Sequence, residues 1–123
     1  MVDKRGLQSE RYPVTAVVAI IGSAIPVNMR RYIYRVKVQD DSGAPNLVEL
    51  QSLLVGGVPV VVDQFRLAVA DETYVDPDEL KEDALPIYII PGSTVVAGAT
   101  VARNLRAIGT GNASLLLEYE DSE

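Results

Sequence analysis

The chain has 123 residues, which suits one domain with a real hydrophobic core. It contains no cysteine, no histidine and no tryptophan. The missing cysteines exclude disulfides and thiolate metal sites, and the missing histidines remove the usual general base near neutral pH. The formal net charge of −6 makes nucleic acid a poor partner, because phosphate binding depends on clustered Lys and Arg.

The longest uncharged apolar run covers residues 14–27 and is too short to cross a bilayer. The first residues carry charges but lack the apolar stretch and the cleavage site of a secretory signal. We therefore expect a protein that folds in the cytosol and has no membrane partner.

Residues 1–12 precede the first expected strand and are predicted to form an extended N-terminal arm, followed by a single β-sandwich domain over residues 13–123. An extended arm can add a strand to the sheet edge of a neighbouring copy. Leu7, Tyr12 and Pro13 are therefore candidate assembly residues. A disordered terminus is an equally good interpretation of the same residues.

Period-two apolar patterns and abundant β-branched residues predict about eight strands in the chain. They lie near residues 13–21, 31–39, 46–54, 58–67, 73–75, 86–90, 94–102 and 114–120. Turn sequences such as DDSG, VGGVP, PGST and GTGN separate them. The number and spacing of the strands predict an all-β fold, an antiparallel β-sandwich of jelly-roll type.

The expected strand at residues 31–39 carries the main cluster of basic side chains. Strict alternation places Arg31, Ile33, Arg35 and Lys37 on one face, opposite Tyr32, Tyr34, Val36 and Val38. A solvated basic face is the first interpretation, since antiparallel sheets often have one wet side. Alternatively, Arg31, Arg35 and Lys37 bind carboxylates of a neighbouring copy, with Glu79 and Glu82 as candidate partners.

The segment DPDELKED, residues 76–83, has the one helical signal in the sequence. Asp76 can cap, Pro77 suits the first helical position, and Glu79 completes a D-x-x-E capping box. The carboxylates could also bind calcium, but the glycine and distal glutamate of an EF-hand loop are not in register. We expect a solvated acidic turn and no metal or other cofactor.

No catalytic motif stands in the sequence. Ser52, Ser93 and Ser114 have no histidine to activate them. The glycine-containing pieces GGVP and GTGN lack the Gly-Lys-Ser/Thr of a phosphate-binding loop. We therefore expect a protein that is not an enzyme.

Three stretches of the chain have a characteristic composition of strands and turns. They are IPVNMRRYIYRVKVQDDSG, DELKEDALPIYIIPGSTV and ASLLLEYED. They contain a proline before an Arg-Tyr strand, an apolar strand after LP, a PGST turn and a last strand that ends acidic. From Pro13 onward the chain resembles small β-sandwich capsid decoration (cement) or accessory virion proteins of head-tailed viruses. The resemblance implies assembly in the host cytoplasm, a homo-oligomer such as a trimer, and binding to a major capsid protein. It implies no catalytic residue.

We therefore expect a non-enzymatic structural virion protein that oligomerises and decorates or stabilises a capsid. Two alternatives stay open. One is the subunit of a filament or tail tube built by strand addition from copy to copy. The other is a carbohydrate- or ligand-binding β-module, with calcium at residues 76–83 as one form of it.

Overall fold

The computed structural model describes residues 7–21, 25–54, 57–77 and 84–123, without the side chain of Leu54. These ranges form ten strands and contain no helix. The strands are β1 (Gln8–Val14), β2 (Ala19–Ile20), β3 (Arg30–Asp40), β4 (Asn46–Leu54), β5 (Val60–Leu67), β6 (Thr73–Asp76), β7 (Tyr88–Pro91), β8 (Ser93–Val96), β9 (Ala99–Gly109) and β10 (Ala113–Ser122).

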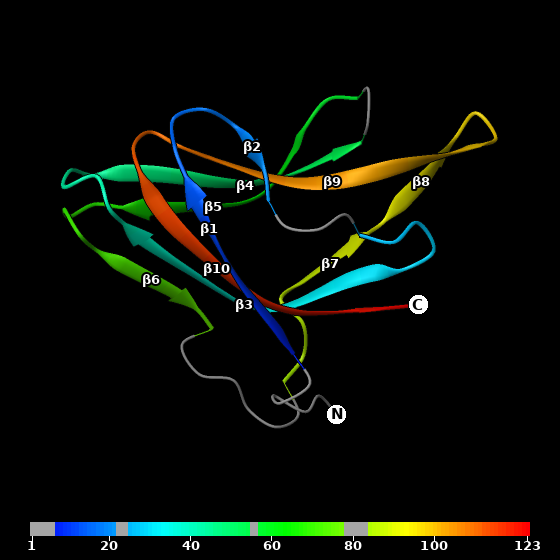
Figure 1. The fold of residues 1–123 in the computed structure, drawn as a ribbon, viewed down its shortest axis with the longest axis horizontal. Helices are drawn as coiled ribbons and strands as arrows, with labels where there is room; N and C mark the ends of the chain where they lie inside the picture. Colours follow the sequence, from blue (N-terminus) through cyan, green and yellow to red (C-terminus); the bar gives the residue numbers. More distant parts are fainter. Residues whose placement is uncertain (1–6, 22–24, 55–56, 78–83) are drawn as a thin grey trace.

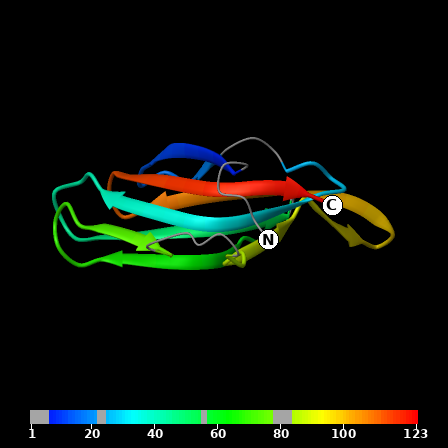
Figure 2. The ribbon, with the colours of Figure 1, turned by 90° about the horizontal axis from the view of Figure 1, so that it is seen from below.

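The strands form two antiparallel sheets. Sheet I has the order β1-β10-β3-β6, with β7 also beside β3, and sheet II has the order β2-β9-β4-β5, with β8 beside β9. In Figure 1, β9, β4 and β5 run across the upper part of the view and β10 and β3 run obliquely to them, and Figure 2 shows β10 and β3 side by side. The predicted all-β, antiparallel fold is confirmed.

The strand pairs are nested like those of a single folded ribbon. The outermost strands β1 and β10 pair first, then β2 with β9, β3 with β6 and β7, and finally β4 with β5. Successive pairs of this series alternate between the two sheets. The ribbon therefore wraps around the space between the sheets, and this space holds the core.

The core is one apolar cluster contributed by both sheets. Its buried members include Val36, Val38, Leu115 and Leu117 from sheet I and Val48, Leu50, Phe65 and Leu105 from sheet II. Each of these large aliphatic or aromatic side chains contributes roughly 1.5–3 kcal/mol by leaving water. The alternation of apolar residues along β3, β4 and β10 thus holds the two layers together.

Two predicted strands have the wrong extent. The strand expected at 13–21 is interrupted at residues 15–18, where the Thr15 hydroxyl bonds the backbone of Val17. The strand expected at 94–102 is a hairpin, because Ala97 and Gly98 have φ angles of 51° and 82° and turn β8 into β9. Positive φ at both central residues gives a turn that matches strand twist. Alanine seldom adopts this conformation, so the sequence pattern did not reveal the turn.

The N-terminal boundary also differs from the expected one. β1 begins at Gln8, so residues 8–12 of the expected arm form a strand of sheet I in this structure. Residues 1–6 lie outside the described residues. The same holds for residues 78–83, which make up most of the expected helical turn; Asp76, its expected cap, is the last residue of β6.

A β-bulge reverses the two faces of β3 near its middle. On β10, Glu118 pairs with Arg35, but the next residue, Tyr119, pairs with Ile33. Tyr34 is the extra residue, and such a residue shifts the alternation of the strand. Ile33 and the residues before it therefore change face relative to the pattern expected from strict alternation.

Two buried polar residues, Asp40 and Asn46, join the loops at one end of the sandwich. The Asp40 carboxylate accepts hydrogen bonds from Ser42 N at 2.9 Å, Ser42 Oγ at 2.6 Å and Asp71 N at 3.1 Å. Asn46 donates to Asp40 at 3.2 Å, and its own oxygen accepts from Thr110 N at 3.0 Å. These bonds connect the β3–β4, β5–β6 and β9–β10 loops.

Candidate functional site

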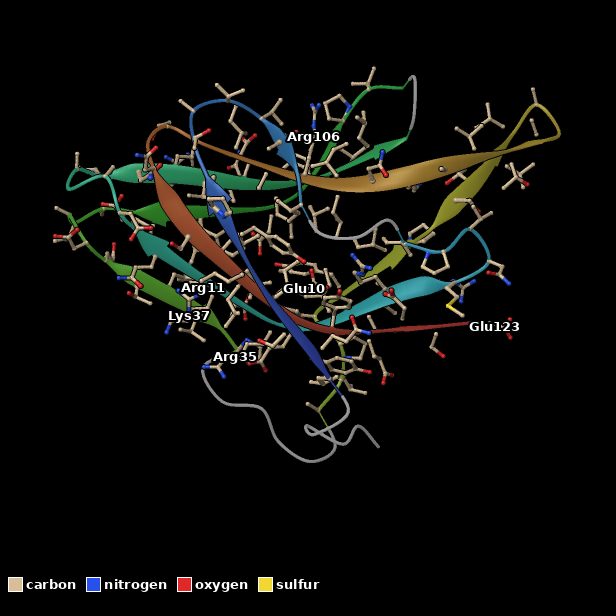
Figure 3. All side chains as sticks on the ribbon, in the orientation of Figure 1. Glu10, Arg11, Arg35, Lys37, Arg106 and Glu123 are labelled. Carbon is tan, nitrogen blue, oxygen red and sulfur yellow. The ribbon has the colours of Figure 1, made fainter. Side chains whose placement is uncertain are left out.

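Three polar side chains, of which Tyr119 is fully buried, join strand β1 to the sandwich. Tyr12 Oη donates a hydrogen bond of 2.5 Å to Glu10, and Tyr119 Oη on β10 also donates to Glu10. The pKa of Glu10 is lowered, mainly by the hydrogen bond from Tyr119. The pKa of Tyr12 is raised, mainly because burial disfavours its charged form. Glu10 lies near the middle of the molecule in Figure 3.

These contacts place the candidate arm residues in the sheet of their own chain. Tyr12 pairs with Leu115 and Pro13 with Ser114. Leu7, immediately before β1, is half-buried. An assembly role for these three residues stays a prediction, and it would have to use the outer edge of β1 rather than a free arm.

Arg31 does not share an exposed face with Arg35 and Lys37, so that expectation is wrong. The bulge at Tyr34 turns Arg31 into the sandwich, where it is 1% exposed. Its Nε and Nη2 donate to the two carboxylate oxygens of Asp121 at 2.8 and 2.9 Å. The guanidinium also lies over the ring of Tyr119, at 4.1 Å from the centroid. Arg31 is a structural residue of the interior.

The outer face of sheet I carries a basic patch that consists of Arg11, Arg35 and Lys37. The strand register places Arg11 on β1 and Lys37 on β3 on either side of Leu116 on β10. Figure 3 shows the three side chains in the same part of the molecule. Arg35 forms an ion pair of 3.6 Å with Glu118. Arg11 was not among the predicted site residues, and it joins the patch because β1 pairs with β10.

The predicted acidic partners of this patch cannot be placed. Glu79 and Glu82 lie outside the described residues, so an ion pair between copies that uses them stays a prediction.

The outer face of sheet II carries a polar ladder that runs across three strands. Gln51 Nε2 and Gln64 Nε2 donate to the two Glu49 oxygens at 2.9 and 2.6 Å. Arg106 Nε donates to Gln51 Oε1 at 2.7 Å. These side chains satisfy one another, and Gln51 in the middle of the ladder is buried.

The edges of sheet II are aliphatic. Among the described residues, eight of the thirteen exposed large hydrophobic side chains lie on or beside these edges. We name the first group the β5 edge, which consists of Val58, Val60 and Val61, and the second group the β2–β8 edge, which consists of Val17, Val18, Ile20, Val95 and Val96. The most exposed members, Val58 and Val17, are 83% and 73% exposed.

The described part of the chain has surface hollows but no cluster of metal-ligating side chains. No group of three or more His, Cys, Asp and Glu side chains that could hold a metal ion is found there. One hollow of about 260 Å³ is lined in part by Arg30 and Glu123, and one of about 310 Å³ in part by Arg66. Neither brings two carboxylates together. None of the described residues forms a helix that could cross a membrane.

Comparison with known proteins finds one solved structure with a weak similarity to this chain. No protein family model and no curated protein matches the chain. One solved structure, described as the structure of infectious bursal disease virus Gx strain, is similar at a TM-score of 0.37 and 12% identity. The similarity covers 90% of this chain and 33% of that one, so the chain spans about a third of its length. This TM-score is too low to assign a shared fold.

Proposed function

We propose that this chain is a non-enzymatic structural protein that self-associates and decorates or stabilises a viral capsid as part of the virion. The observation that carries the proposal is the pair of aliphatic edges of sheet II. Large hydrophobic side chains at 59–83% exposure, such as Val58, Val60 and Val95, leave apolar surface in water unless another chain covers it.

The contrast with sheet I supports this interpretation. β1, an edge strand of sheet I, carries Glu10, Arg11 and Pro13. Charges and proline on an edge strand are the usual means by which proteins prevent other chains from pairing there. The stretch at 57–62, which includes the first half of β5, reads GVPVVV and has no charge. The first three residues of β5 thus lack the charges that β1 carries, whereas Pro59 lies just before the strand and Asp63 and Arg66 lie further along it.

The nested pairing supports the finer proposal that the sandwich is of jelly-roll type. In that architecture eight strands form two antiparallel sheets from one wrapped ribbon. This chain has ten strands, two more than that architecture. β6 and β7 lie one after the other on the same side of β3 and together take the place of one strand, and β8 is an extra strand that forms a hairpin with β9.

The proposed partners are other copies of the chain, with a closed trimer favoured, and a major capsid protein. The basic patch is the surface we assign to acidic side chains of such a partner, since arginine pairs well with carboxylates. Assembly in the host cytoplasm, without nucleic acid or membrane, completes the proposal.

Light scattering over a range of concentrations tests self-association, and co-sedimentation with capsids of the virus that encodes the chain tests decoration. We expect a closed oligomer that sediments with the capsids. A chain that is monomeric at all concentrations and stays in the supernatant would overturn the proposal. Open growth without a limiting mass would instead indicate the filament or tail-tube alternative.

A further inference from the structure

We infer that the two aliphatic edges of sheet II bind each other between copies, with the β2–β8 edge of one chain against the β5 edge of the next. Sheet II would then continue from copy to copy. This inference rests on the proposed self-association and specifies the surfaces that carry it.

The strand register shows that these two edges lie on opposite sides of sheet II. β2 and β4 both pair with residues 106–107 of β9, so they flank β9 on opposite sides. Ile21 N donates to Leu105 O at 3.0 Å, and Arg103 N donates to Gly92 O at 2.9 Å. Residues two apart on a strand direct their backbone groups to the same side. β8 therefore lies on the β2 side of β9, away from β4 and β5.

The backbone of both edges has room for a further strand. Within the described part of the chain, β5 pairs with β4 alone and β8 pairs with β9 alone. Each strand thus has an outer side whose N–H and C=O groups have no strand partner. An edge-to-edge contact satisfies such groups with main-chain hydrogen bonds and covers the flanking side chains.

The charge distribution selects the same two edges. Each copy carries a formal net charge of −6, so copies repel one another wherever carboxylates meet. Residues 57–62 and 93–102 contain no charged side chain, and neither do residues 15–21. Contact between these stretches therefore brings no charge out of water, and a charge left buried and unpaired would be strongly destabilising.

The β8–β9 hairpin has the shape that this contact requires. In Figures 1 and 2 it extends beyond the end of the sandwich, away from the β3–β4 turn. Val95 and Val96 near its tip are 70% and 44% exposed, and Val60 and Val61 at the start of β5 are 59% and 45% exposed. Valine on each side offers the β-branched packing that cross-strand pairs favour.

Opposite edges of one sheet make a heterologous contact, in which each copy uses one surface as donor and a different one as acceptor. Such contacts close into rings when the rotation between copies allows it and otherwise grow into filaments. The same pair of edges therefore accounts for a closed trimer or for open growth, and the angle between copies decides which one forms.

Disulfide trapping tests the inference, because the natural chain contains no cysteine and gives no background. Val61→Cys and Val95→Cys each place one thiol on one edge. Val69→Cys, in the loop between β5 and β6 and 65% exposed, is the matched control for random collision. The full-length variants are oxidised alone and in pairs, and the cross-linked species are separated and identified by mass spectrometry.

We expect the mixture of Val61→Cys and Val95→Cys to form mixed dimers several-fold faster than either forms with Val69→Cys. If Val95→Cys instead cross-links mainly to itself, the contact is symmetric and the inference is wrong. Mixed dimers that form no faster than those of the control also overturn it.

Light scattering of the unmodified chain separates this inference from the proposed function. An oligomer without preferential cross-linking would overturn the edge pairing alone, whereas a monomer would overturn both. As a second readout, Val95→Asp should give a monomer that still unfolds in one cooperative transition, and Val69→Asp should still oligomerise.

Discussion

Arg31 and Asp121 are direct cross-strand partners on β3 and β10, and two hydrogen bonds of 2.8 and 2.9 Å join their side chains inside the sandwich. The Arg31 side chain is 1% exposed and that of Asp121 is 17% exposed. A buried guanidinium without its carboxylate would keep the cost of leaving water and lose the attraction that offsets it.

Asp121→Ala should therefore lower the free energy of unfolding by about 3 kcal/mol, measured by urea denaturation at neutral pH. Glu118→Ala is the matched control, because the Arg35–Glu118 pair is 28% and 21% exposed and should cost less than about 1 kcal/mol. Equal losses in the two variants would contradict the structural role of Arg31.

Asp40 should make the stability of the protein decrease in acid. Its hydrogen bonds, first of all that from the Ser42 hydroxyl, lower its pKa from 3.8 to about 2. A lowered pKa in the folded state stabilises the protein above pH 3.8, and this contribution is lost as the pH falls towards 2. Thermal melting between pH 5 and pH 2 measures the loss. Asp40→Asn should start less stable and show a flatter pH dependence over the same range.

Asn46 should be one of the most sensitive polar positions in the chain. Its side chain donates to Gly111 O at 3.1 Å and Asn112 O at 3.2 Å, and it accepts from Gly111 N at 3.1 Å. Asn46→Ala leaves these buried groups without partners and should cost about 2–4 kcal/mol of unfolding free energy. Gln64→Ala, which removes an exposed hydrogen bond of the polar ladder, should cost less than about 1 kcal/mol. A mild effect at Asn46 would show that the loops hold together without it.

Gly92 should not tolerate a larger residue. A Cβ atom at this position would lie 2.1 Å from the carbonyl oxygen of Pro26, so the backbone would have to move. Gly92→Ala should lower the melting temperature by several degrees and weaken the bond between Gly92 N and Met29 O. Amide hydrogen exchange at Gly92 measures the second effect. If the Gly92 amide of the wild type and the corresponding amide of the variant exchange equally slowly, the backbone around this position can shift at no cost, which would contradict the prediction.

The basic patch should govern partner binding without affecting the fold. Lys37→Glu reverses one charge beside Arg11 and should weaken binding to an acidic capsid surface, most strongly at low salt. Arg66→Glu, at an exposed position of β5, is the control for net charge. Co-sedimentation at two salt concentrations makes the measurement, and equal effects of the two variants would remove the patch from the binding surface.

The sequence alone determined the all-β class of this protein and most of its strands. β3, β4, β5, β6 and β10 lie within a few residues of their expected ranges, because alternating apolar residues and turn-forming residues act locally. Val36 and Val38 in the core follow from the same alternation. The basic character of Arg35 and Lys37 on the outer face was also readable from it.

Only the tertiary structure decided where Arg31 points, which edges are open and how β1 is held. Arg31 turns inward because a bulge at Tyr34 changes the register with β10, a strand far away in the sequence. Among the described residues, the edges of sheet II are open because β8 and β5 each pair on one side, and β1 is a strand because its backbone pairs with β10. Period-two patterns report which side chains share a face, but pairing partners and bulges arise from contacts between distant segments. Such contacts leave no local periodic signal.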